Sequence, residues 1–197
     1  MILGSHNSLT SYPSLGFSRC IGWFGNIFSR CQYKGMTIEK QLEKGVRWFN
    51  LQVTKHDNRW VGSHGLMLYN VNLHNVMLIL DDFAKTHKGK KDKIYVQLYL
   101  DKNFTHKVDH AEFEILCDDC MSLYKNVIFQ RLWNEQDNIE MMTFSIDGEE
   151  RFWSRSWSEG KGRKWYERIP FLKKWTKKYK DEWIRNCTHE YLMMDFI

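Results

Sequence analysis

The clearest hydrophobic periodicity in the chain lies between residues 72 and 86. Apolar side chains recur there at every third or fourth position, which predicts an amphipathic helix carrying Leu73, Val76, Met77, Leu80, Phe83 and Ala84 on one face. Two apolar runs, 46–53 and 94–100, lie on either side of this segment and predict strands. The pattern therefore begins as an alternation of strand, helix and strand.

Weaker signals continue the alternation along the chain. Short apolar runs predict further strands at 1–3, 60–63, 127–132, 141–146 and 191–196. Capping residues and a proline predict more helices, over 37–42, from 109 onward and over 170–183. Residues 11–35 are rich in Gly, Ser and aromatic side chains and are expected to form a long excursion. Together these elements predict an α/β fold, either a small distorted TIM-type (β/α) barrel or a doubly wound sheet.

Polar side chains follow several of the predicted strands directly. They are His6, Asn50, Gln52, His64 and Asp101. In α/β barrels the chemistry takes place at the carboxyl ends of the strands. We therefore expect these five side chains to gather at one end of the sheet.

Composition fits one soluble, globular domain spanning 1–197. The 197 residues are 43% hydrophobic and 27% charged, with only two prolines. No apolar run approaches the roughly 20 residues that a membrane-spanning helix needs, and no leader precedes His6. The expected location is therefore cytoplasmic or peripheral to a membrane, and the five cysteines are expected to be reduced.

Cys117 and Cys120 have a spacing that also occurs in redox and zinc sites, but no second pair completes such a site. They fall on one stripe of the helix predicted from 109 onward, together with Phe113, Leu116 and Leu123. Buried helical thiols are therefore expected, with redox or metal chemistry as the alternative.

A basic, tryptophan-rich segment occupies residues 151–185. It holds twelve Lys or Arg against four Asp or Glu, a net charge of +8, whereas the whole chain carries +5. Five of the nine tryptophans also lie there. One interpretation is a core-facing aromatic stripe with a solvated basic face. The other is a surface that docks on anionic membranes. Nucleic acid is a weaker candidate partner, because no recognised motif supports it.

Two histidines can act as a general base and a general acid, since each changes charge near neutral pH. Here they lie in the segments Gly-Ser-His-Asn-Ser-Leu-Thr at 4–10 and Ser-His-Gly at 63–65, with Gln-Leu-x-x-Gly-Val-Arg-x-Phe-x-Leu at 41–51 between them. In this order the segments resemble the catalytic X region of phosphatidylinositol-specific phospholipase C. The resemblance is dense over residues 2–101 and returns at the final Met-Asp-Phe-Ile, 194–197.

The resemblance implies a distorted TIM barrel and a phosphoric diester hydrolase or lyase. In the family, an inositol hydroxyl attacks the phosphate and releases the glycerol side, giving a cyclic phosphate. His6 matches the base that deprotonates this hydroxyl, and His64 matches the acid that protonates the leaving alcohol. The short form, without accessory domains, is typical of bacterial or phage members.

The chain departs from the family where the negative charge on the phosphate must be neutralised. Members use calcium held by carboxylates and an Asn, or an Arg in its place; here Asn7 remains, but the strand positions hold the neutral Asn50 and Gln52. Asp101, with Asn7 and Asn50, is one candidate for a weak metal site, so Ca²⁺ and a metal-free site both stay open.

Two further residues are candidates around the reaction. A Lys or Arg from elsewhere in the chain is a candidate for approaching the phosphate, and Lys102 is one example. Asp195 is a candidate carboxylate for orienting one histidine, and the alternative is a strand residue paired with a nearby Arg or the backbone.

Two hypotheses follow from the sequence. The first is a phosphodiesterase acting on a phospholipid headgroup or a related small phosphodiester. The second is a catalytically silent barrel that binds anionic lipid or a partner through its basic segment.

Overall fold

The computed structural model describes residues 2–87, 92–101, 110–129, 132–134, 139–142 and 191–194. The helical elements are η1 (Ser8–Ser11), α1 (Phe17–Cys20), α2 (Gly22–Ser29), α3 (Ile38–Glu43), α4 (Leu73–Thr86) and α5 (His110–Leu123). The strands are β1 (Ile2–Ser5), β2 (Val46–His56), β3 (Arg59–His64), β4 (Met67–Asn72), β5 (Tyr95–Leu100), β6 (Ile128–Phe129), β7 (Leu132–Asn134), β8 (Ile139–Met142) and β9 (Tyr191–Met194).

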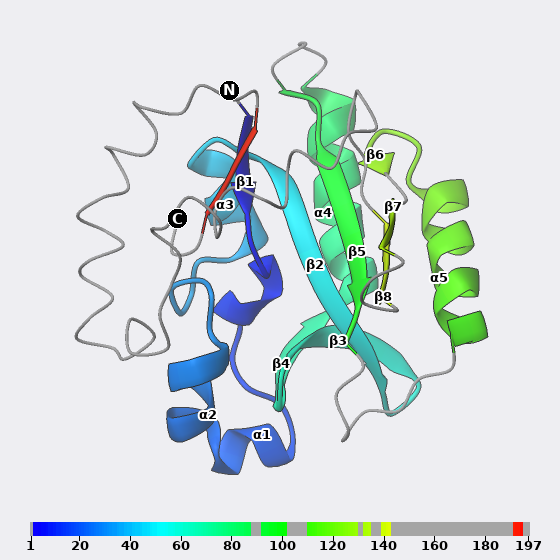
Figure 1. The fold of residues 1–197 in the computed structure, drawn as a ribbon. Coiled ribbons are helices and arrows are strands. Elements are labelled where there is room, and N and C mark those ends of the chain that lie inside the picture. The colour runs from blue at the N-terminus through cyan, green and yellow to red at the C-terminus, as the bar shows by residue number, and fades with distance from the viewer. Residues whose placement is uncertain are drawn as a thin grey trace.

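The strands form one mixed sheet, which is open over the described residues. Its parallel part runs in the order β9, β1, β2, β5 and β6, so the last strand of the chain lies beside the first (Figure 1). The antiparallel strands β3 and β4 extend from the far half of β2, and β8 and β7 extend from β5. The fold is therefore mixed α/β, as the alternation of elements predicts.

The hairpin between β2 and β3 has a local cause. Its two linking residues, Asp57 and Asn58, both have positive φ, at 47° and 57°. Two-residue hairpin loops need this left-handed backbone because its twist matches the twist of the strands. Asp and Asn tolerate it better than most residues. The hairpin delivers His64 to the end of β3.

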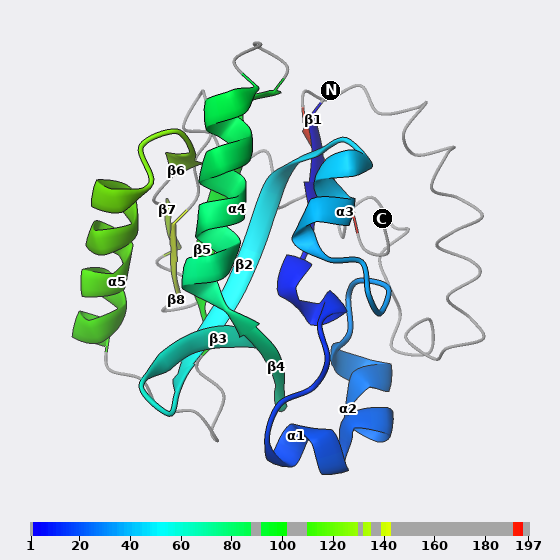
Figure 2. The same ribbon diagram turned by 180° about the vertical axis from the view of Figure 1, so that it is seen from behind.

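The sheet separates an apolar face from a polar one. Helices α3 and α4 lie on the same face of β2, as the two opposite views show (Figures 1 and 2). Buried apolar side chains such as Phe49, Leu51, Val96 and Leu98 share one cluster with the apolar stripe of α4. Side chains alternate along a strand, so the intervening positions of β2 and β5 place Asn50, Gln52 and Gln97 on the other face, where Trp48 and Tyr95 stack in a second, smaller apolar cluster.

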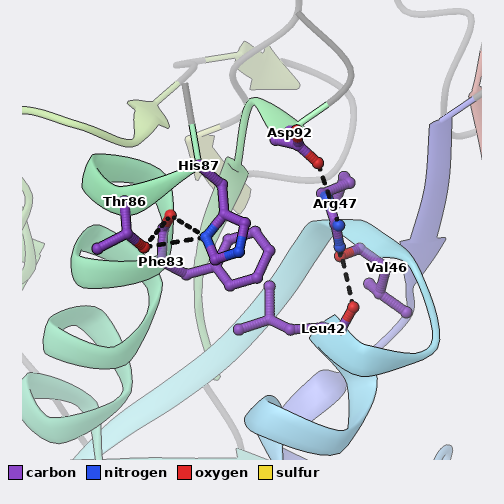
Figure 3. A network of polar contacts seen from close by, with 7 residues as sticks. All are labelled: Leu42, Val46, Arg47, Phe83, Thr86, His87 and Asp92. Carbon is purple, nitrogen blue, oxygen red and sulfur yellow. Dashed lines mark hydrogen bonds and ion pairs between the residues drawn. The ribbon is translucent and has the colours of Figure 1, made fainter. Parts of the chain in front are cut away.

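The amino-terminal end of β2 is held by Arg47 (Figure 3). Its guanidinium donates to the carbonyls of Leu42, at 3.0 Å, and Val46, at 2.9 Å, and forms an ion pair with Asp92 at 3.3 Å. It also lies 4.7 Å from the ring centroid of Phe83. One side chain therefore connects α3, β2, α4 and the segment before β5.

Most predicted elements that fall on described residues are confirmed within one to three residues, whereas the helix expected over 170–183 lies outside them. The excursion at 11–35 contains two short helices, α1 and α2, that were not predicted. Strand β4 was not predicted, and the single strand expected over 127–132 is two short ones, β6 and β7. In α5 Phe113, Cys117 and Cys120 are buried as expected, but Leu123 is 66% exposed because the buried stripe continues through Tyr124 instead. None of the helices in the described ranges has the length and apolar character needed to cross a bilayer.

Candidate functional site

The structure brings the two predicted histidines together. His6 directly follows β1, and His64 is the last residue of β3. Their ring centroids lie 6.4 Å apart and the ring planes are inclined at 76°. His6 is 8% exposed, so the pair lies in a largely enclosed site. At this distance and angle the rings are in the range of an edge-to-face contact, so two proton-transfer side chains lie side by side.

Asn7 fixes the orientation of His6. Its backbone is left-handed, with φ at 45°, and its N–H donates to Oδ1 of Asn50 at 2.9 Å. Its side-chain amide nitrogen lies 3.2 Å from Nε2 of His6 and donates to Sγ of Cys31 at 3.4 Å. An amide nitrogen can only donate, so Nε2 of His6 accepts. In the tautomer that accepts this bond, Nε2 of His6 carries no proton, as a general base requires.

His64 has the opposite character. Its Nδ1 lies 2.5 Å from the carbonyl oxygen of Ser29 and 3.8 Å from Sγ of Cys31. Burial disfavours the charged ring, and His6 also opposes it, but Cys31 and the Ser29 carbonyl outweigh both effects and raise the pKa of His64. The shift favours the charged ring relative to an ordinary histidine, which is the direction that suits a general acid.

Ser29 and Cys31, which contact His64, come from a segment that the sequence did not identify as part of a functional site. Residues 29–32 begin at the last residue of α2 and lie within the excursion at 11–35. The hydroxyl of Thr10 accepts from the backbone N–H of Cys31 and of Gln32, at 2.9 and 3.0 Å. The Gln32 side chain donates to the carbonyls of His6 and Met194, at 2.8 and 3.1 Å. These bonds tie the segment to the ends of β1 and β9.

The remaining predicted residues share the polar face of the sheet. Asn50 lies opposite Gln97 in the parallel register of β2 and β5, and Gln52 is two positions farther along. Both amides are buried, but among the described residues Gln52 forms no hydrogen bond with either histidine. Asp101 follows β5, is 5% exposed, and its N–H donates to the carbonyl of Val53 at 2.9 Å.

Arg30 and Tyr69 add a buried cation and a buried phenol beside this cluster. The Arg30 guanidinium carbon lies 5.8 Å from the ring centroid of Tyr69. Burial raises the pKa of Tyr69 far above its usual value; Arg30 opposes the rise, whereas Cys31 and Asp101 add to it. Tyr69 is therefore a neutral hydroxyl whose pKa is affected by Arg30, Cys31 and Asp101. Neither Arg30 nor Tyr69 was predicted from the sequence.

The described donor set does not fit calcium. The ion prefers several carboxylate oxygens, whereas Asp101 is the one carboxylate among the predicted residues that the structure describes. The amides of Asn7 and Asn50 are engaged with the fold and with His6. Across the described ranges no three His, Cys, Asp or Glu side chains come together as a metal site would require.

Three further predictions lie outside the described residues: Asp195, Lys102 and the basic segment 151–185. Comparisons of the sequence with models of known protein families and with curated proteins found no match.

Proposed function

We propose that this chain is a phosphodiesterase that uses a histidine pair for general acid-base catalysis, as its resemblance to the phospholipase C X region implies. The observation that carries the proposal is the approach of His6 and His64 to 6.4 Å between ring centroids. They come from different strands and have opposite proton preferences. Such a pair suits displacement at phosphorus, where one oxygen loses a proton and another gains one.

The roles follow from the contacts of each ring. Nε2 of His6 takes the proton of the attacking hydroxyl as the new P–O bond forms. His64 gives a proton to the leaving alcohol oxygen as the old P–O bond breaks. In the free protein the Asn7 amide donates to Nε2 of His6, so the substrate hydroxyl replaces that contact. The substrate is a phospholipid headgroup or a related small phosphodiester.

The finer fold proposal is a distorted TIM-type barrel. Two observations support it. Strand β9 pairs in parallel with β1, so the last described strand lies next to the first. Helices α3 and α4 lie on one face of β2 (Figures 1 and 2), while the buried amides of Asn50 and Gln52 belong to the other. In a barrel the helices form the outer ring and the site lies at the carboxyl ends of the strands. His6 follows β1, which is parallel to β2, as this arrangement requires, whereas His64 ends β3, which runs antiparallel to β2.

Neutralisation of the phosphate charge is assigned to the protein itself. A protonated His64 would supply positive charge at the reacting phosphate, and the raised pKa of its ring favours that form. Preorganised groups of this kind often contribute the largest part of a rate enhancement. The described donor set does not fit a hard cation, so no step is derived through a metal.

The alternative function is a catalytically silent barrel that binds anionic lipid through residues 151–185. The specific observation in its favour is that Asn50 is a neutral side chain where the family carries a charged one. Its oxygen is also occupied by the backbone N–H of Asn7. The net charge of +8 in the basic segment supplies the attraction for a membrane surface.

One experiment separates the two functions. The purified chain is incubated with phosphatidylinositol vesicles and with soluble phosphodiesters, in EDTA and in Ca²⁺, alongside His6→Ala and His64→Ala. His74→Ala is the matched control because His74 is exposed on α4. We expect turnover that survives EDTA and falls roughly 10²- to 10⁴-fold in each site variant. No turnover by the folded chain, with vesicle binding retained, would establish the silent barrel.

A further inference from the structure

A pocket of about 470 Å³ opens beside the first two helices, outside the histidine cluster. Its volume falls within the roughly 300–1,000 Å³ that is common for ligand sites. The residues that line it come from the excursion at 11–35, and they are Pro13, Ser14, Arg19, Gly22, Trp23, Asn26, Arg30 and Lys34.

The lining carries three cations and no acid. Arg19 and Lys34 are exposed, whereas Arg30 is 8% exposed. Within the described ranges none of the three forms an ion pair with a carboxylate. Nη1 of Arg30 is buried without a hydrogen-bond partner in that same part of the chain. Three uncompensated positive charges around one pocket favour an anionic ligand.

Neutral donors of the pocket suit an oxyanion as well. The amide nitrogen of Asn26 donates to Oγ of Ser14 at 2.9 Å. The Ser14 hydroxyl accepts this bond and keeps its own proton for a ligand. Arginine forks and serine hydroxyls together match the several oxygens of a phosphate group.

We propose that this pocket is a second phosphate-binding site, separate from the reacting histidines, in which Arg19, Arg30 and Lys34 hold the phosphate group of a ligand. The phosphate comes either from an anionic phospholipid or from a soluble phosphoester. Trp23 lines the pocket and is 81% exposed, and Phe24 beside it is 63% exposed. These aromatic side chains would contact a lipid but are not needed for a soluble ligand.

The first test titrates inorganic phosphate into the full chain by calorimetry. Arg19→Gln/Lys34→Gln is compared with Lys40→Gln/Arg59→Gln, which removes the same charge at exposed positions outside the pocket. We expect the pocket pair to weaken phosphate binding at least tenfold and the control pair to leave it unchanged, since each charged hydrogen bond is worth about one decade or more. Equal binding by the two variants, or no binding by the wild type in either arm, would overturn the proposal.

The second arm identifies the source of the phosphate. Phosphatidylcholine vesicles with and without phosphatidylglycerol are co-sedimented with the wild type, the two charge variants and Trp23→Ser/Phe24→Ser. A lipid source predicts binding that depends on phosphatidylglycerol and is lost in both the pocket pair and the aromatic pair. A soluble source predicts calorimetric binding with no vesicle binding that responds to the pocket pair.

The proposal of a phosphate site and the proposal of a phosphodiesterase reaction are refuted by different outcomes. His64→Ala alters the histidine cluster and leaves all lining residues of the pocket intact. Phosphate binding that persists in His64→Ala and is lost on adding Arg19→Gln/Lys34→Gln supports the pocket, whether or not the wild type turns over a phosphodiester. Phosphate binding that disappears in His64→Ala alone places the anion at the histidines and overturns the inference.

Discussion

Asn50→Ala tests how the fold positions the general base. In the native chain Oδ1 of Asn50 accepts the backbone N–H of Asn7 at 2.9 Å, and both residues are at most 3% exposed. Truncation leaves that N–H buried without its acceptor, which costs about 1–3 kcal/mol. With a urea dependence of about 1–3 kcal/mol per molar, the unfolding midpoint falls by roughly 1 M.

The same change loosens the left-handed turn at Asn7, whose side chain contacts His6. A displacement of about 1 Å in a reacting group can cost roughly 10²-fold in rate, so kcat/KM for a phosphodiester is expected to fall by about this factor. Both quantities are measured on the same preparation, by urea denaturation followed by fluorescence and by steady-state kinetics.

Gln52→Ala is the matched control for Asn50→Ala. Gln52 lies on the same face of β2 and is also buried, but it accepts no hydrogen bond from the turn at Asn7. A smaller loss of stability and rate is expected. If Asn50→Ala is as stable and as active as Gln52→Ala, the hydrogen bond does not position His6 and the reasoning is refuted.

Three further predictions concern other parts of the chain. Arg47→Met removes two hydrogen bonds to carbonyls and one ion pair, so urea denaturation should show a loss of about 2–3 kcal/mol. Cys31→Ala removes an interaction that raises the pKa of His64. Because an acid acts only when protonated, the alkaline limb of the pH–rate profile should move to lower pH. Cys20 is exposed, whereas burial raises the pKa of Cys120 to about 12, so timed alkylation with mass spectrometry should modify Cys20 first.

Each of these predictions has an outcome that contradicts it. For Arg47 the control is Arg59→Met, at an exposed position. Equal stability of the two variants would show that the contacts of Arg47 do not stabilise the fold. If the alkaline limb of Cys31→Ala stays at the same pH or moves to higher pH, the thiol does not stabilise the charged form of His64. Alkylation of Cys120 at the rate of Cys20 in the folded chain contradicts its burial.

The sequence predicts the elements with strong periodicity and the residues that follow them. The apolar stripe of α4 and the runs of β2 and β5 define the apolar face, and the rule that polar groups follow strands identifies His6 and Asp101. The same rule selected Asn50 and Gln52, but these lie within β2 rather than at its end. These patterns depend only on residues close in sequence, so they can be recognised without knowing the tertiary contacts. The meeting of His6 with His64 is the long-range consequence that the structure adds.

The segment after α2 could not be predicted in the same way. Cys31, Gln32 and Arg30 belong to an irregular stretch whose place is set by hydrogen bonds to Thr10, His6 and the end of β9. No periodicity encodes such contacts. Strand β4, Met67–Asn72, was not predicted, because the polar Asn70 and Asn72 interrupt its short apolar run.

The separate roles of the two histidines are tested most directly by varying the leaving group. Soluble inositol phosphodiesters with an alkyl and with a p-nitrophenyl leaving group are compared in the wild type, His6→Ala and His64→Ala. A p-nitrophenolate departs without a proton, so His64→Ala should lose far less activity on that substrate than on the alkyl ester. His6→Ala should lose the same large factor on both. Equal losses in the two variants on both substrates, or no loss in either, would contradict the assignment of base and acid.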